Sequence, residues 1–269
     1  MKSYDYNVRE EFLSSDTSRF KRLNPIKDLH NVAAKPLPNK HIKNGTGTYN
    51  YPDGSFYTGA IKNSMANGKG KLTFLNGDYY QGEWKDNKCH GFGTFSHSSG
   101  AIYEGFWVQN QRHGYGKEVW ANGAIYEGEF SKGQRHGHGT YFFEDQAMYS
   151  GGWVRNEISG WGKYEEGNGR MYEGEWLRGE FHGKGNYVYK MGVEYEGKFE
   201  NGKRNGYGIM TFDGSVYKGN WVDDKKEGFG VMVLKDKDQF EGYWENDEYI
   251  GVDRRPTEMT SRSNISKVR

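Results

Sequence analysis

The chain has 269 residues and a formal net charge of +1, a length that allows one or two domains. Glycine accounts for 40 residues and aromatic residues for 16% of the chain, so we expect rings packed against glycines rather than a conventional aliphatic core. The single cysteine, Cys89, excludes a disulfide framework and a multi-cysteine zinc site, and we expect neither a signal peptide nor a membrane span because no apolar run is long enough.

The first segment, residues 1–44, is basic, with a net charge of +4. We interpret it as an N-terminal extension and linker. Scattered apolar residues allow a short helix near Val8–Leu23, and Pro36 and Pro38 mark a linker after it.

A repeat with a period of 23 residues follows this segment. Each unit contains an aromatic residue, a glycine two positions later, usually a second aromatic residue after two more positions, and then a Gly-x-Gly pair. The first ring of the unit recurs at Tyr57, Tyr80, Tyr103, Tyr126, Tyr149, Tyr172, Tyr195, Tyr217 and Phe240. We take as structural repeat positions Tyr80, Gly82, Trp84, Gly91, Gly93, Tyr103, Gly105, Trp107, Tyr172, Gly174 and Trp176.

Each unit predicts a β-hairpin. Alternate residues such as Tyr80, Gly82 and Trp84 fall on one face of a strand, and a turn residue such as Asn87 precedes the second strand. The glycines allow rings to lie over the bare backbone of the neighbouring strand. We therefore expect an all-β fold, an elongated single-layer antiparallel sheet of stacked β-hairpins with short, mostly irregular tails. About 17 strands spaced by about 4.8 Å give a length of roughly 80 Å.

We assign the array to residues 45–251, with about eight full repeats and a half-repeat at each end. The interval before Tyr217 is one residue shorter than the others, which predicts a shortened turn after Gly208. The array carries a net charge of −6, and residues 252–269, with a net charge of +3, form a basic tail that we expect to be disordered.

The repeat resembles the MORN repeat (membrane occupation and recognition nexus). The resemblance is carried by segments such as Glu127-Gly128-Glu129-Phe130 with Arg135-His136-Gly137-His138-Gly139, and Tyr172-Glu173-Gly174-Glu175-Trp176, and it covers about residues 45–251. It implies stacked hairpins and a scaffold without an appended catalytic domain. The radial-spoke-head members of the family further suggest a cytoskeletal role in a cilium, flagellum or axoneme.

The residues themselves favour no enzyme, cofactor or metal. Equivalent histidines such as His90 and His113 lie two strands apart, about 9.6 Å, which is too far for neighbours in the column to share a zinc ion. The Gly-x-Gly pairs lack the remaining residues of a phosphate-binding loop, and we interpret the recurring glutamates as a solvated face. We therefore predict that the chain is not an enzyme, with no catalytic, cofactor-binding or metal-binding residues.

Two rows of residues are candidate interaction surfaces. The middle residues of the Gly-x-Gly pairs face away from the rings, and their aromatic members form a candidate partner surface: Phe92, Tyr115, Trp161, Tyr207 and Phe229. Basic residues near the first turns form a candidate edge for an anionic partner: Arg112, Arg135, Arg155, Arg178, Lys203, Arg204, Lys225 and Lys226.

We expect protein partners in a cytoskeletal or axonemal complex, in the cytoplasm. The alternatives are a peripheral membrane adaptor that binds acidic phospholipid, and a regulatory partner of a lipid kinase. The acidic array disfavours nucleic acid. An open sheet edge needs cover, so we expect the N-terminal segment or a second copy, as in a homodimer, to cap one end.

Overall fold

The computed structural model describes residues 17–22, 43–190 and 192–253, which form one 3-10 turn and one sheet. The elements are η2 (Ser18–Arg22), β1 (Asn44–Asn50), β2 (Phe56–Lys62), β3 (Met65–Thr73), β4 (Tyr79–Lys85), β5 (Lys88–Ser96), β6 (Ile102–Val108), β7 (Gln111–Val119), β8 (Ile125–Ser131), β9 (Gln134–Phe142), β10 (Met148–Val154), β11 (Glu157–Glu165), β12 (Met171–Leu177), β13 (Glu180–Lys190), β14 (Val193–Glu200), β15 (Lys203–Phe212), β16 (Ser215–Val222), β17 (Lys225–Val233), β18 (Gln239–Glu245) and β19 (Glu248–Gly251).

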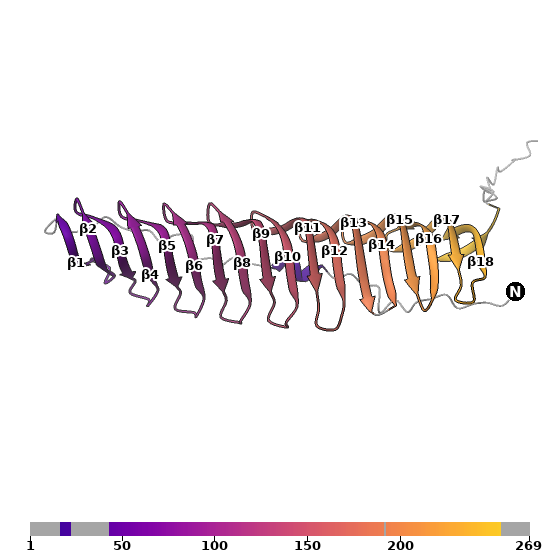
Figure 1. The fold of residues 1–269 in the computed structure, drawn as a ribbon, viewed down its shortest axis with the longest axis horizontal. Coiled ribbons are helices and arrows are strands. Elements are labelled where there is room, and N and C mark those ends of the chain that lie inside the picture. Colours follow the sequence, from indigo (N-terminus) through magenta and orange to yellow (C-terminus); the bar gives the residue numbers. More distant parts are fainter. Residues whose placement is uncertain (1–16, 23–42, 191, 254–269) are drawn as a thin grey trace, which may run out of the picture.

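The all-β prediction is confirmed: the sheet is antiparallel throughout, and each strand pairs with its neighbours in sequence. The strands follow one another along a rod, and η2 lies beside β10 and β11 near the middle of it (Figure 1). The sheet has 19 strands rather than 17, because the incomplete ninth unit still contributes both β18 and β19.

Two of the sequence predictions fall largely outside the described residues. The expected helix near Val8–Leu23 is described only at its end, where η2 lies, and the C-terminal tail is described only at Val252 and Asp253. The shortened turn after Gly208 is present: β15 and β16 are joined by Asp213 and Gly214 alone, both with positive φ, at 48° and 81°. This geometry is that of a tight two-residue hairpin turn.

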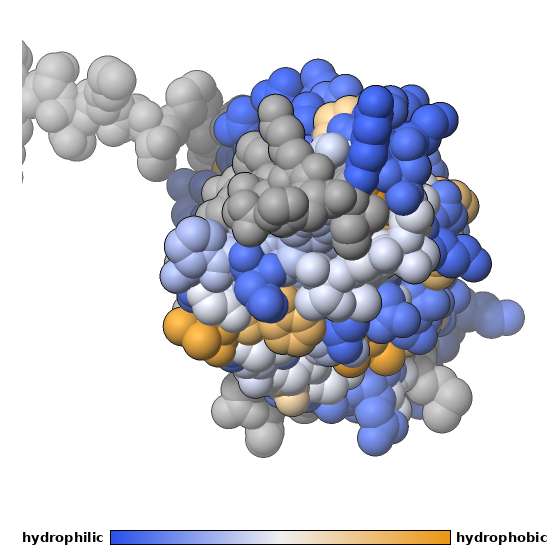
Figure 2. All heavy atoms as spheres, turned by 90° about the vertical axis from the view of Figure 1, so that its left-hand side faces the viewer, coloured by the Kyte–Doolittle hydropathy of each residue, from blue (hydrophilic) through white to orange (hydrophobic). Residues whose placement is uncertain are grey.

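An irregularity in every full hairpin bends the sheet. In β6 and β7, Gly105 pairs with Gly116 and Trp107 with Arg112, so three residues of β7 oppose one residue of β6. The bulge includes Gly114, whose φ of 63° favours glycine. Because a bulge bends its strand, the repeated bulges curve the sheet around the rings, and the end of the rod has a rounded cross-section (Figure 2).

Tyrosine rings cover pairs of facing glycines along the inner side of this curve. Tyr126 lies against Gly128 of its own strand and Gly139 of the next, and its Oη donates a 2.9 Å hydrogen bond to the carbonyl oxygen of Glu129. The same bond recurs from Tyr57 to Tyr217 in all eight units that begin with tyrosine. Burial raises the pKa of these phenols above its usual value. The prediction that rings lie over bare backbone is therefore confirmed.

In every unit after the first, which has Ile61 at this position, the second ring joins the unit to the one before. Trp107 packs edge-on against Tyr103 of its own unit and Tyr80 of the preceding one, with ring centroids 5.1 and 5.2 Å apart. Its Nε1 also donates a 3.0 Å hydrogen bond to the carbonyl oxygen of Gly93 in the preceding unit. Such edge-on aromatic pairs contribute about 0.5–1.5 kcal/mol each beyond their buried area, so neighbouring units stabilise one another.

We predict that Gly128→Ala destabilises the array. Its Cβ would lie 2.5 Å from the Gly139 Cα and 2.6 Å from the Tyr126 Oη, in a layer with no free space. We expect the free energy of unfolding in urea to fall by about 1–3 kcal/mol. The control is Gly167→Ala, because a Cβ there meets no atom within 4 Å. Equal stability of the two variants would contradict the close fit of ring and backbone.

Candidate interaction surfaces

The candidate partner row lies on the outer face of the sheet, opposite the rings. Phe92, Tyr115, Trp161, Tyr207 and Phe229 are between 45% and 59% exposed, whereas the ring-row tyrosine Tyr80 is fully buried. Two of the five rings lean on a neighbour across the strand pair: Phe92 packs edge-on against Phe106, and Phe229 against Tyr243, each with centroids 5.6 Å apart. The others stand as single exposed rings on β7, β11 and β15.

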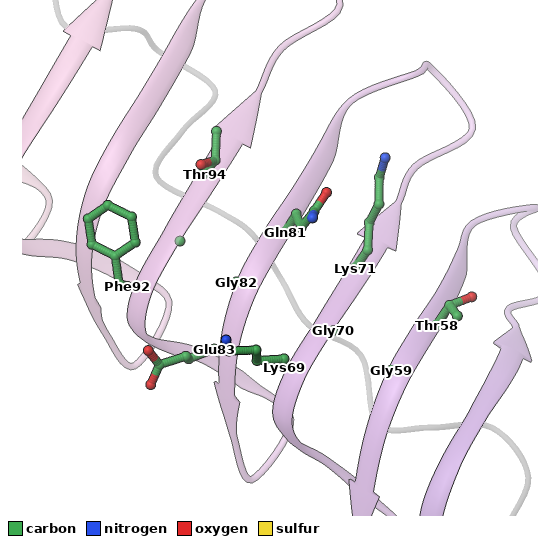
Figure 3. Close-up of a pocket in the computed structure, with 11 residues that line it drawn as sticks. Thr58, Gly59, Lys69, Gly70, Lys71, Gln81, Gly82, Glu83, Phe92 and Thr94 are labelled. Carbon is green, nitrogen blue, oxygen red and sulfur yellow. The ribbon is translucent and has the colours of Figure 1, made fainter.

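A first groove of about 500 Å³ crosses β2 to β5 on this face. Its lining combines glycine backbone with the side chains of Lys69, Lys71 and Gln81, as Figure 3 shows. Lys69 lies directly opposite Glu83 in the register of β3 and β4, and the Lys71 Nζ lies 3.9 Å from the centroid of the Tyr79 ring. Lys71 therefore has an aromatic partner within the chain, whereas the Glu83 carboxylate lies over Gly91.

A second groove, of about 670 Å³, crosses β11 to β15. Trp161 and Tyr207 line it together with Lys184 and Lys198, and Gly185 and Gly197 contribute backbone. Glu173, Asn186, Glu196 and Ile209 complete the lining. This groove combines exposed rings with charged side chains, as partner surfaces of proteins often do.

The predicted basic edge is wrong for half of its residues. Arg112, Arg135, Arg204 and Lys226 are buried on the inner face, with exposures of 1%, 0%, 2% and 7%. Only Arg155, Arg178, Lys203 and Lys225 are exposed near the turns. The reason is strand alternation: the buried four occupy the same repeat position as Ala66, Cys89, Ile158 and Phe181, which also face inward.

Aromatic rings surround the buried cations. The Arg135 guanidinium lies 4.9 Å from the ring centroid of Trp153 and 5.6 Å from those of Tyr126 and Trp120, and burial lowers its pKa. The Arg204 guanidinium lies 4.2 Å from the Trp221 centroid. Cation–π attraction of this kind offsets part of the cost of removing a cation from water. These side chains therefore belong to the interior and not to a lipid-facing edge.

Arg112 has a carboxylate partner in the interior. Its guanidinium forms an ion pair with Glu118, and both side chains are fully buried. A second nitrogen of Arg112, Nη2, donates a 2.6 Å hydrogen bond to the carbonyl oxygen of Gly133. Glu118 stands where the neighbouring units have Phe95 and Tyr141, so the pair replaces an apolar contact. A buried pair of this kind is weak evidence for stability, because its desolvation opposes its attraction.

The N-terminal turn η2 occupies a site that the sequence did not reveal. Phe20 is buried among Phe143, Tyr164 and Trp176, with centroids 6.0, 4.8 and 4.9 Å away. Arg19 bonds both carboxylate oxygens of Asp145, at 3.0 and 2.9 Å. The described part of the N-terminal segment thus lies against the middle of the array and not at an end.

The turn glycines Gly179 and Gly202 lie against η2. A Cβ at Gly179 would lie 3.2 Å from the Phe20 Cβ, and one at Gly202 would lie 3.5 Å from the Thr17 Oγ1. The equivalent turn residue is Asn156 in the preceding unit, where its Oδ1 accepts a hydrogen bond from the backbone of Arg135. The two units after Asn156 have glycine at its repeat position, at Gly179 and Gly202, and this was the sequence signal for the η2 binding site.

In the described residues, no three histidine, cysteine, aspartate or glutamate side chains lie close enough together to bind a metal ion. The same residues include no helix that is long and apolar enough to cross a membrane. Burial raises the pKa of the Cys89 thiol well above its usual value, which opposes formation of a reactive thiolate.

The fold and the two faces define a repeat protein built from stacked hairpins. The MORN repeat family matches residues 39–56, 57–79, 80–102, 103–125, 126–148, 172–193, 195–215 and 217–239. The chain therefore belongs to the MORN repeat family. Repeats of this family are generally non-catalytic and typical of scaffolds for protein interactions. The unit at 149–171 is not among the matched ranges, yet it forms the same hairpin, β10 and β11.

No curated protein matches the sequence of the chain. Among solved structures, the chain is similar to the G-box domain of the microcephaly protein CPAP, with 12% identity, a TM-score of 0.37, and coverage of 75% of this chain and 100% of that one. It is also similar to the TCP10 domain of Danio rerio CPAP, with 10% identity, a TM-score of 0.41, and coverage of 73% and 94%. At such TM-scores these likenesses carry no functional inference.

We predict opposite effects for single and double substitutions at the buried ion pair. Glu118→Leu leaves the Arg112 charge buried without its carboxylate, and we expect it to lower the free energy of unfolding by about 3–5 kcal/mol. The double variant Arg112→Ile with Glu118→Tyr copies the Ile158 and Tyr164 of another unit. We expect it to be at least as stable as the wild type in urea unfolding. A double variant as unstable as the single one would show that the pair itself is required.

We predict that Gly179→Asn displaces η2 and leaves the array folded. Asparagine tolerates the φ of 77° at this turn, but its side chain collides with Phe20. Trypsin should then cleave after Arg19 about tenfold faster, with an unchanged thermal midpoint of the array. The control is Gly192→Asn, at a φ of 79° with no atom within 4 Å of the added Cβ. Unchanged cleavage after Arg19 in Gly179→Asn would contradict the docking of η2.

Proposed function

We propose that this chain is a non-enzymatic scaffold that binds protein partners through the aromatic row of its outer face. The observation that carries the proposal is the row itself: five large rings, each at the centre of a Gly-x-Gly pair, are 45–59% exposed on one face. Burying such rings drives association, and aromatic residues are enriched at the centres of protein interfaces. No fold requirement places them there, because Lys69 and Lys184 occupy the same repeat position.

The setting that we propose is a cytoskeletal assembly, with the cilium, flagellum or axoneme as the favoured site. The support is the resemblance to radial-spoke-head proteins with MORN repeats. A rigid rod of 19 strands is about 86 Å long at about 4.8 Å per strand, which suits a spacer or platform between partners.

The test is capture of partners by the purified full chain from an axonemal or cytoskeletal extract. We expect the combined variant Phe92→Ala, Tyr115→Ala, Trp161→Ala and Tyr207→Ala to lose at least one partner that the wild type retains. The control replaces Leu75 and Val252 with alanine, because these side chains are 80% and 66% exposed but lie off the row. Identical partners for the wild type and the row variant would contradict the proposal.

A membrane adaptor remains the second candidate, with one observation in its favour. The exposed cations Arg155, Arg178, Lys203 and Lys225 follow one another along the turns, and juxtaposed cations attract anionic headgroups. Lys203 lies 3.3 Å from Asp223, so part of this charge is already neutralised. Flotation with phosphatidylserine vesicles separates the candidates: salt-sensitive binding lost in Arg155→Glu with Arg178→Glu supports an adaptor, and indifference to anionic lipid excludes it.

A further inference from the structure

The second groove differs from its neighbours in how its charges are paired. At three hairpin junctions the middle residue of Gly-x-Gly faces a carboxylate on the next strand: Lys69 faces Glu83, Tyr115 faces Glu129 and Trp161 faces Glu175. Between β13 and β14, Lys184 instead faces Lys198 directly, and both are exposed. Like charges opposite one another repel, so an anion placed between them is stabilised by both.

Among the described residues, Lys184 and Lys198 form no ion pair with the nearby glutamates. The Glu175 carboxylate lies over Gly183 and accepts a 3.0 Å hydrogen bond from the backbone N–H of Lys184. Glu173 and Glu196 line the groove two residues along their strands from Glu175 and Lys198. The Lys198 chain extends over Gly206, with its Cδ 3.3 Å from the position of an added Cβ. The two lysines therefore line the groove beside Trp161 and Tyr207, and Glu173 and Glu196 line it two residues further along their strands.

The walls of the groove are apolar and far apart. Trp161 on β11 and Tyr207 on β15 are 58% and 57% exposed, and they are four strands, about 19 Å, from one another. An extended chain advances about 3.3 Å per residue, so about six residues span the distance. A free anion or a lipid headgroup would use the lysines but would leave both rings in water, so a peptide fits better.

The backbone groups of this region are hydrogen-bonded within the sheet, because β11 to β15 each pair with the neighbouring strands. A partner cannot add as a strand to this face and must be recognised by side chains. One acceptor in the lining has no hydrogen-bond partner among the described residues: the buried Oδ1 of Asn186.

We propose that the groove between Trp161 and Tyr207 binds an extended segment of a partner protein, in which an acidic side chain between two apolar side chains meets Lys184 and Lys198. The proposal rests on the scaffold function proposed above and specifies the chemistry of the partner at this one site. The two apolar side chains pack on the two rings, and the carboxylate lies between the lysines.

The test uses the full chain and three synthetic peptides. The first is acetyl-Leu-Gly-Asp-Gly-Glu-Gly-Leu-amide, whose leucines are six residues apart and lie on the same side of an extended chain as its two acidic side chains. The second replaces Asp and Glu with Asn and Gln, and the third replaces both leucines with glycine. Binding is followed by the shift of the Trp161 indole N–H resonance, which is assigned by its loss in Trp161→Phe. We expect the first peptide to bind at least about tenfold more tightly than either of the others, as the loss of its charged or of its apolar side chains implies.

The variant Lys184→Glu with Lys198→Glu should weaken the first peptide at least about tenfold. The control is Lys69→Glu with Lys71→Glu in the first groove, which should leave binding unchanged. Equal binding of the three peptides, binding that survives Lys184→Glu with Lys198→Glu, or no shift with any peptide at millimolar concentration overturns the proposal. Inorganic phosphate or phosphatidylserine vesicles that shift the same resonance as strongly as the peptide also overturn it.

Failure of the acidic-segment proposal can be distinguished from failure of the scaffold proposal. If the row variant loses its captured partners while Lys184→Glu with Lys198→Glu retains all of them, the scaffold function stands and the acidic-segment proposal fails. If the row variant loses nothing, both fail together.

Discussion

The contact between a tyrosine ring and two facing glycines supports the rest of this structure. Any side chain at Gly128 or Gly139 would strike the Tyr126 ring or the opposite backbone, so the ring sits directly on the sheet. The phenol then reaches the carbonyl oxygen of Glu129, which explains why tyrosine and not phenylalanine begins most units. A single curved sheet can in this way bury its rings without a second layer of secondary structure.

This contact also explains why the units need one another. One hairpin supplies a tyrosine and a tryptophan, but the tryptophan packs on the tyrosine of the unit before, and its indole bonds that unit's backbone. Much of what stabilises a unit therefore lies at its junctions, as in other repeat proteins. Because the inner face is committed to packing, residues on the outer face are free to vary, and this is where Trp161, Lys184 and Tyr207 stand.

The 23-residue period was sufficient to predict the strands, the hairpins and the ring-on-glycine contact, because side-chain alternation in a strand follows directly from residue spacing. The period also contained the information that was missed at Arg112 and Arg135. Their repeat position is Cys89 and Ile158 in other units, which places it inside, but the positive charge suggested a surface instead.

The docking of Phe20 could not be predicted, because it joins residues 17–22 to a site more than a hundred residues away, and glycine at two turns does not specify an occupant. The exposure of the aromatic row follows from the spacing, whereas the facing of Lys184 and Lys198 requires the register.

The most direct test of the central claim is a spectrophotometric titration of tyrosine ionisation in the folded protein at alkaline pH. Burial raises the pKa of Tyr51 to about 12 and moves the pKa of the row phenols, such as Tyr80 and Tyr126, upward as well. The resulting stability is present below the ordinary phenol pKa of about 10 and is lost as the pH rises toward the raised values. We expect the row phenols to ionise only together with cooperative unfolding of the sheet. Gradual ionisation of all tyrosines near pH 10, in a sheet that stays folded, would contradict it.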